Sequence, residues 1–289
     1  IQGRKKSFYL NPEELFAPAA EQGAHFSDCG DRVVNRLMAS TQIIHRIPGA
    51  IARLGWRKLL RRFVIVVAVI TLSYHALILF RITKLRHSNP STTKMIEQRA
   101  ASAKEDGREP KITLTWVPYQ NISPHLVRAV LAGEDLRFSR HAGIDWEGIR
   151  LAMKKNWEEK RLSRGGSSIT QQLAKNLFLS PSRNPVRKLH EMLIAWEMEQ
   201  ILGKRRILEI YLNVIEWGDG IYGAEAAARH YFGVSAASLN SEQAIFLSAI
   251  IPAPLNGYNP NDRSYYLRHR VNVIRNLTKH PLLRSAPQF

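Results

Sequence analysis

The sequence predicts a mainly α-helical protein behind one N-terminal transmembrane helix. The segment 63–80 contains no Asp, Glu, Lys or Arg and approaches the roughly twenty apolar residues that cross a bilayer. From Ser123 onward, apolar residues recur every three or four positions, which is the period of an amphipathic helix, and strand-like alternation is scarce. The domain after the membrane segment is therefore expected to be built from helices.

Charge and cysteine content narrow the classes of partner. The 289 residues carry 42 Lys and Arg against 24 Asp and Glu, a formal net charge of +18. This excess favours an anionic partner, which could be a nucleic acid, an anionic lipid or a phosphate-bearing substrate. The single cysteine, Cys29, excludes an intrachain disulfide and any metal site with several cysteine ligands.

The apolar segment 63–80 is expected to span a membrane rather than to be a cleaved signal peptide, because it is long and no small-residue cleavage site follows it. A buried helix of a soluble protein is the alternative. Basic residues are more frequent before the segment than after it, which predicts a cytoplasmic N-terminus and an external C-terminal domain. They are Arg46, Arg53, Arg57, Lys58, Arg61 and Arg62 before it, and Arg81, Lys84 and Arg86 after it.

The chain is expected to have four parts. Residues 1–62 form a cytoplasmic tail that is largely disordered, because its first 45 residues are polar without a convincing period. Residues 63–80 form the transmembrane helix, 81–110 a polar linker that has room for a short helix, and 111–289 the functional domain.

The first candidate catalytic residue is Glu134. Ser123 and Pro124 are typical of a helix start, and the apolar residues that follow them lead to this carboxylate. Partial desolvation at the end of an apolar stripe would make Glu134 a better proton acceptor. The alternative is an ordinary helix-end acid that forms a surface ion pair with Arg137 or Arg140.

The next predicted helix has an apolar face with tryptophan at both ends. The face is formed by Trp146, Ile149, Met153 and Trp157. With basic residues beside it, such a helix can lie in a lipid interface, which the nearby membrane segment favours. The alternative is a face that packs against the core of the domain.

The segment 165–176, GGSSITQQLAKN, begins as a glycine turn and continues as a helix. Ser168 and Gln171 fit a capping box, and a helix N-terminus presents free N–H groups that suit a phosphate. Gln172 and Lys175 share the polar face, so Lys175 is a candidate pyrophosphate ligand. The alternative is a well-capped surface helix, and the sequence contains no GxxxxGK[ST] P-loop.

The following helix again has an apolar stripe. The stripe is formed by Val186, Leu189, Leu193 and Trp196. Glu191 lies beside it and could simply pair with Arg187 one turn earlier. The letters HEMLI begin like a zinc-protease motif, but Ile194 stands where the second His must be, so this zinc site is rejected. A further helix is expected from Lys204 to Asn213.

These segments resemble the glycosyltransferase family that polymerises lipid II into peptidoglycan, over roughly residues 116–266. The matching motifs are EDxxFxxHxG at 134–143, the segment 165–176, RKxxE at 187–191, ILExYLN at 207–213, YGxExAAxxYFG at 222–233, and PxP with NP at 252–260. Such motifs in this order are specific, and they outweigh the surface-acid alternative for Glu134. The sequence departs from the family at Ser168, where Thr is usual, and at Leu151, where some members carry a basic residue that Arg150 could replace.

The resemblance implies a lysozyme-like helical fold and one reaction. The GlcNAc 4-hydroxyl of an incoming lipid II attacks the anomeric carbon of the growing chain's MurNAc with inversion, and undecaprenyl pyrophosphate leaves. Glu134 would be the general base, and Glu191 would position substrate or a divalent cation, Mg²⁺ or Mn²⁺, although no metal ligand is certain. Lys175 and Arg183 would neutralise the pyrophosphate. The other substrate-binding residues implied are Asp135, Ser167, Ser168, Gln171, Gln172, Asn176, Arg187 and Lys188.

Relatives are either bifunctional, with a transpeptidase domain, or monofunctional. The sequence contains no KTG box, so a monofunctional enzyme of a bacterial inner membrane is expected, with its catalytic domain in the periplasm. Expected partners are lipid II, the growing glycan chain, the membrane and the cell-wall synthesis machinery. Nucleic acid is not expected, because the domain is external.

Two other functions remain as alternatives. A lysozyme-like hydrolase or lytic transglycosylase also uses a single Glu, but it needs neither a spanning anchor nor phosphate ligands such as Lys175 and Arg183. A non-catalytic membrane scaffold would be marked by the loss of Glu134 or Lys175, and both are present.

Overall fold

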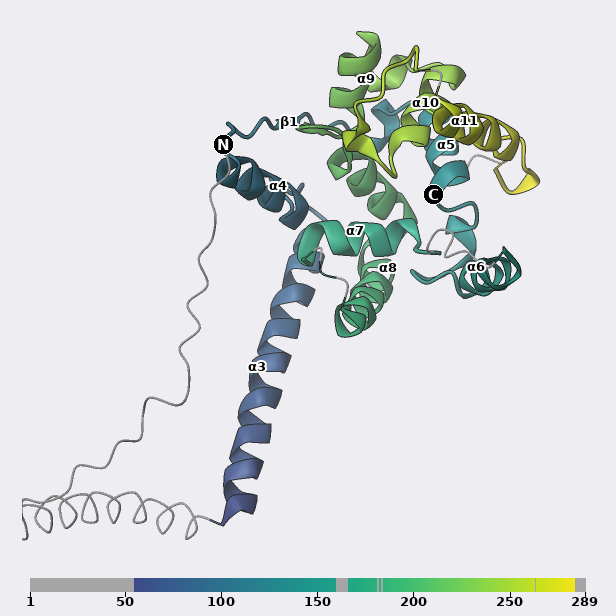
Figure 1. The fold of residues 1–289 in the computed structure, drawn as a ribbon. Helices are drawn as coiled ribbons and strands as arrows, with labels where there is room; N and C mark the ends of the chain where they lie inside the picture. Colours follow the sequence, from purple (N-terminus) through teal and green to yellow (C-terminus); the bar gives the residue numbers. More distant parts are fainter. Residues whose placement is uncertain (1–54, 160–165, 181, 183, 263, 284–289) are drawn as a thin grey trace, which may run out of the picture. The chain divides into compact units, whose positions relative to one another are not determined.

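The computed structural model describes residues 55–159, 166–180, 182, 184–262 and 264–283 (Figure 1). Most of the expected tail, 1–62, lies outside the described residues, as do Cys29, Gly165 and Arg183. The chain divides into two compact units, 1–70 and 71–289.

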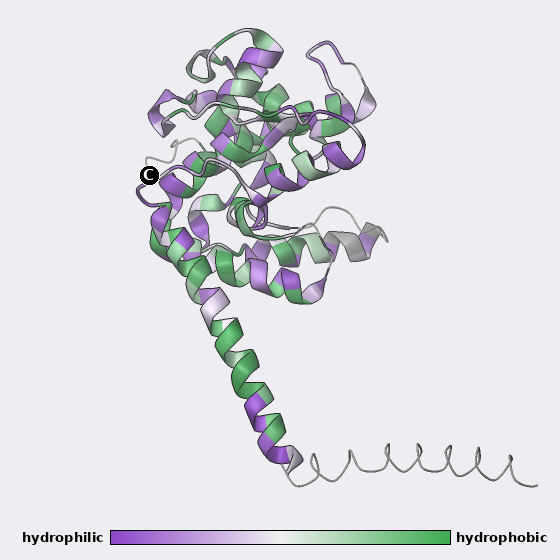
Figure 2. Cartoon of the chain, turned by 90° about the vertical axis from the view of Figure 1, so that its left-hand side faces the viewer, coloured by the Kyte–Doolittle hydropathy of each residue, from purple (hydrophilic) through white to green (hydrophobic). Residues whose placement is uncertain are grey.

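Helix α3 (Trp56–Lys84) contains the expected transmembrane segment and extends beyond it at both ends. The helix is long and apolar enough to cross a membrane, and only 6% of its most apolar stretch is buried. Figure 2 shows hydrophobic residues through its middle and hydrophilic residues near its N-terminal end. This exposure argues against a core helix of a soluble protein.

The unit 71–289 is mainly α-helical, as predicted. After α3 its described helices are α4 (Lys94–Glu105), α5 (Pro124–Glu134), α6 (Trp146–Glu159), α7 (Ile169–Phe178), α8 (Pro185–Val214), α9 (Ala224–Phe232), α10 (Ser241–Ile250) and α11 (Tyr265–Leu277). The described strands are β1 (Thr113–Leu114), β2 (Glu216–Gly218) and β3 (Ile221–Tyr222). They form a small sheet in the order β1-β3-β2, in which β3 is parallel to β1 and antiparallel to β2.

Local sequence explains where the helices begin. Ser123 caps α5 by accepting a hydrogen bond from the backbone of His125, and Pro124 occupies the first turn. The predicted capping box of α7 is confirmed, with Ser168 and Gln171 each bonded to the other's backbone. The helix expected from Lys204 is the second part of α8, which bends at Gly203.

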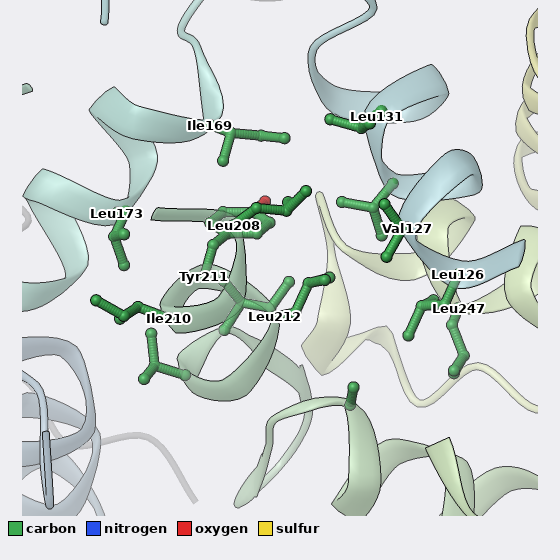
Figure 3. Packing of buried hydrophobic residues seen from close by; sticks show 14 of the residues in the cluster. Leu126, Val127, Leu131, Ile169, Leu173, Leu208, Ile210, Tyr211, Leu212 and Leu247 are labelled. Carbon is green, nitrogen blue, oxygen red and sulfur yellow. The ribbon is translucent and has the colours of Figure 1, made fainter. Parts of the chain in front are cut away.

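The core lies where α5, α7, α8 and α10 meet (Figure 3). Ile169 and Leu173 of α7 face Leu208 and Tyr211 of α8, and all four side chains are fully buried. Leu131 of α5 belongs to the same buried cluster and joins α5 to it. Burial of each such aliphatic side chain contributes about 1.5–3 kcal/mol, so this junction holds the three helices in fixed positions.

The segment 81–110, expected as a linker, is part of the packed unit. Ile82, Leu85 and Ile96 are buried, and α4 packs against α7. Arg206 of α8 donates hydrogen bonds to the carbonyl oxygens of Leu85 at 2.8 Å and Ser88 at 2.9 Å. A few apolar side chains and one arginine therefore hold a segment that is mostly polar in sequence.

Gly143 should be intolerant of a side chain. It has a φ of +88°, and a Cβ there would lie 2.8 Å from the carbonyl oxygen of Ala195 in α8. Because backbone strain and a backbone clash add, Gly143→Ala should lower the free energy of unfolding by about 2–4 kcal/mol in chemical denaturation. Gly233→Ala is the matched control, since its φ is +68° but no atom lies within 4 Å of the added Cβ. Equal losses in the two variants would contradict the packing described.

Candidate active site

Glu134 is held by side chains from two distant helices. It is the last residue of α5, and its side chain is 10% exposed. Gln172 of α7 donates to its Oε2 at 3.1 Å, and Arg270 of α11 donates to its Oε1 at 3.1 Å. Arg137, the surface partner considered above, instead pairs with Asp145 at 2.8 Å. The carboxylate is therefore a nearly buried, oriented group rather than a surface acid.

Tyr211 fixes the orientation of the Gln172 amide. Its hydroxyl donates to Gln172 Oε1 at 2.9 Å, which turns the amide nitrogen toward Glu134. Burial raises the pKa of Tyr211 well above its usual value of 10, and the charges of Glu134 and Asp135 raise it further. Tyr211 therefore remains a hydroxyl donor.

Sequence reasoning did not identify Arg270 or Tyr211 as site residues. Tyr211 lies in the motif at 207–213, so the sequence did mark it as part of a family motif. Nothing in the sequence indicated that its hydroxyl orients Gln172. Arg270 lies beyond the matched motifs and is 4% exposed; it also donates from Nε to the carbonyl oxygen of Ala249 at 3.0 Å. Only the packing of α11 against α5 brings it to the carboxylate.

Asp135 connects the end of α5 to the start of α7. Its side chain is 1% exposed, and His141 Nε2 lies 3.0 Å from each of its carboxylate oxygens. The backbone N–H of Ile169 donates to Oδ2 at 3.0 Å. Asp135 therefore holds the end of α5 against the start of α7, and it also lines the pocket beside Glu134.

Ser168 and Gln171 also support the site from within. Both are buried, and the Ser168 hydroxyl donates to the carbonyl oxygen of Gly143 as well as capping α7. Beside them lies a pocket of about 210 Å³, whose wall includes Glu134, Ser167 and Asp145. Asp135 and Ser168 themselves line this pocket together with Glu134.

A cluster of cations lies farther along α7. Glu191 is buried in α8 and pairs with Arg187 at 2.7 Å and with Lys188. Lys188 also donates to the Ser167 hydroxyl at 2.8 Å.

Lys175 stays accessible to solvent, yet its pKa is lowered. The largest cause is the loss of water around it, and the charges of Arg187 and Lys188 lower the pKa further, whereas the charge of Glu191 opposes this shift. The cluster therefore carries excess positive charge. Asn176, which follows Lys175 on α7 and is another of the predicted substrate-binding residues, is buried.

Glu191 is paired with a basic side chain at each of its two carboxylate oxygens. Both carboxylate oxygens face cations, Oε2 toward Arg187 and Oε1 toward Lys188. Within the described part of the chain, no group of three or more His, Cys, Asp or Glu side chains could hold a metal ion. This arrangement instead lets Glu191 hold the two basic side chains in place.

Two helices present exposed apolar faces. On α6 the side chains of Trp146, Met153 and Trp157 are 64%, 67% and 87% exposed, so the core-packing alternative for this face is wrong. On α8 the exposed apolar residues are Val186, Leu189, Leu193 and Trp196. Faces of this kind mark surfaces that contact a membrane, a ligand or another protein.

The fold and site define a helical enzyme with a nearly buried, oriented carboxylate, that of Glu134, and a cationic cluster farther along α7. The sequence model of the Transglycosylase family matches residues 102–279. A biosynthetic peptidoglycan transglycosylase of Methylobacillus flagellatus is 47% identical over 220 residues, which are 76% of this chain and 90% of that protein. One from Nitrosospira multiformis is 45% identical over 214 residues, covering 74% and 92% respectively. The chain therefore belongs to the transglycosylase family, which confirms the resemblance drawn from the motifs.

Proposed function

We propose that this protein is a membrane-anchored peptidoglycan glycosyltransferase that polymerises lipid II into glycan strands. The observation that carries the proposal is the arrangement along α7. Gln172, which holds the carboxylate of Glu134, is followed one turn later by Lys175 in the cationic cluster. One helical turn is about 5 Å, so a base and a pyrophosphate site lie within the span of one substrate.

The chain's own residues suit both halves of the reaction. Glu134 accepts the proton of the GlcNAc 4-hydroxyl as that oxygen forms a bond to the anomeric carbon of MurNAc. The bond from that carbon to the pyrophosphate breaks, and the configuration inverts. Lys175, with Arg183 by resemblance, stabilises the charge that develops on undecaprenyl pyrophosphate. Glu191 positions Arg187 and Lys188.

The cationic cluster favours transfer from a lipid pyrophosphate over hydrolysis. A lysozyme-like hydrolase needs one acid but gains nothing from Lys175, Arg187 and Lys188 near it. A non-catalytic scaffold would not require a carboxylate that Arg270 and Gln172 hold in one orientation. Lipid II and the growing glycan chain are therefore the proposed substrates.

The membrane placement follows from α3 and from the substrate. A lipid-linked substrate stays in the bilayer, and α3 is suited to cross it once. We place the N-terminus in the cytoplasm and the catalytic domain in the periplasm, at the inner membrane, because basic residues are more frequent before the segment 63–80. Other proteins of cell-wall synthesis are the proposed partners, and nucleic acid has no part.

Glu134→Gln should abolish most activity while the protein stays folded. The amide keeps the size of the side chain but cannot accept the proton, so polymerisation of labelled lipid II should fall by at least about 10²-fold. Glu158→Gln, at a side chain 61% exposed on α6, is the control. A folded Glu134→Gln protein with near-normal turnover would refute the assignment of the base.

Lys175→Ala should slow turnover, because the leaving pyrophosphate loses a cation, and Lys175→Arg should be milder because the charge remains. Arg183→Ala should behave like Lys175→Ala. The checks are the initial rate with lipid II and the affinity for a lipid-pyrophosphate analogue, with the exposed Lys279→Ala as control. If both alanine variants bind the analogue and turn over as the parent does, the phosphate site lies elsewhere.

The exposed face of α6 should bind lipid. A protein lacking residues 1–80, and with them the apolar segment 63–80, should still co-sediment with anionic vesicles. Trp146→Glu combined with Trp157→Glu should release it without lowering its melting temperature, because both side chains are exposed. Tyr265→Glu, at a tyrosine 79% exposed on α11, is the control. Retained binding, or a collapsed melt, would show that this face does not contact lipid.

A further inference from the structure

A second pocket lies between α7 and α4, and α4 belongs to the segment that was expected to be a linker with room for a short helix. Its volume is about 230 Å³. Arg99 and Met95 of α4 line one side, and Lys175 and Asn176 of α7, with Leu179 after it, line the other. Arg99 lies before the family match at 102–279, so the family match gives it no role.

The charged residues that line this pocket are both cations. In the described part of the chain, Arg99 and Lys175 line it and no carboxylate does. The nearest carboxylate to Arg99 is Glu216, whose Oε2 accepts from its Nε at 3.2 Å and its Nη2 at 3.0 Å. That contact uses one edge of a guanidinium whose side chain is 47% exposed, so its other N–H groups can reach a ligand.

The pocket lies farther along α7 than Gln172, the residue that holds the catalytic base Glu134. Gln172, Lys175 and Asn176 lie on the same face of α7, and Leu179 follows directly after the helix ends. The first of them bonds to Glu134, and the last contributes apolar surface together with Met95. Cations beside apolar side chains suit a phosphate that is joined to a hydrocarbon chain.

We infer that this pocket binds the pyrophosphate and the first prenyl units of the lipid-linked substrate, with Arg99 as a phosphate ligand beside Lys175. The inference rests on the proposed function and extends it to a residue outside the motifs. It also gives α4 a part in substrate binding, since α4 carries Arg99 to the pocket.

A purely structural role for Arg99 makes a different prediction. Glu216 is buried, and burial raises its pKa even though Arg99 lies beside it. Under this alternative, the sole role of Arg99 is to neutralise the carboxylate of Glu216. In that case Glu216→Gln, which removes the need for a partner, should make Arg99 dispensable. If Arg99 binds substrate, Glu216→Gln leaves its charge in the pocket, and loss of Arg99 still matters in the Glu216→Gln background.

The experiment measures binding of farnesyl pyrophosphate to the full-length protein in detergent, by calorimetry, together with KM for lipid II. Arg99→Gln should weaken binding by roughly tenfold or more and raise KM, because a charge-assisted hydrogen bond is lost. Arg99→Lys should recover part of this. Glu216→Gln and the exposed Arg108→Gln should bind as the parent does, and adding Arg99→Gln to Glu216→Gln should reproduce the full loss.

Three outcomes would overturn the inference. Arg99→Gln could bind farnesyl pyrophosphate like the parent, or its effect could vanish in the Glu216→Gln background. Inorganic pyrophosphate could bind as tightly as farnesyl pyrophosphate, which would exclude a prenyl contact. Failure of the parent to polymerise lipid II, with the binding results as expected, would instead contradict the proposed function.

Discussion

The buried carboxylate of Asp135 is the contact on which the catalytic arrangement depends. It accepts the first backbone N–H of α7 at Ile169 and faces His141, so the end of α5 and the start of α7 are held together. Glu134 is the residue immediately before it, and Gln172 lies in the first turn of α7. One buried acid therefore sets the position of the base relative to the amide that orients it.

From that contact, α7 extends the site in one direction. The side chains on one face reach, in turn, the base, the cationic cluster and the pocket beside α4. Glu191 and the hydroxyl of Ser167 restrain Lys188, so the positive charge next to this face is held in place before a substrate arrives. Such preorganisation is what electrostatic stabilisation of a leaving pyrophosphate requires.

Local signals in the sequence were sufficient for much of the fold. The Ser123 cap, the capping box at Ser168 and the apolar periods gave α5 and α7 correctly, and the motif order gave the family. The contact between Arg270 and Glu134 could not be predicted, because it depends on how α11 packs against α5. The packing of α4 was missed because few apolar residues, such as Ile96, hold it.

Motif membership also did not indicate which of the predicted substrate-binding residues are buried and bonded within the protein. Asp135, Ser168 and Gln171 stand in family motifs, but their side chains are buried and bonded to backbone groups of the chain. An apolar period likewise could not say whether the faces of α6 and α8 pack inward, and here they are exposed. These distinctions depend on burial, which only the assembled helices determine.

The most direct test of this account is the initial rate of lipid II polymerisation by Asp135→Asn. An amide offers one acceptor oxygen where the carboxylate serves both His141 and the N–H of Ile169. The start of α7 should shift relative to Glu134, and a displacement of about 1 Å can cost on the order of 10²-fold in rate. We predict a fall of at least about tenfold in folded protein, although Glu134 is intact. A folded Asp135→Asn protein that polymerises lipid II at the parent rate would contradict the account.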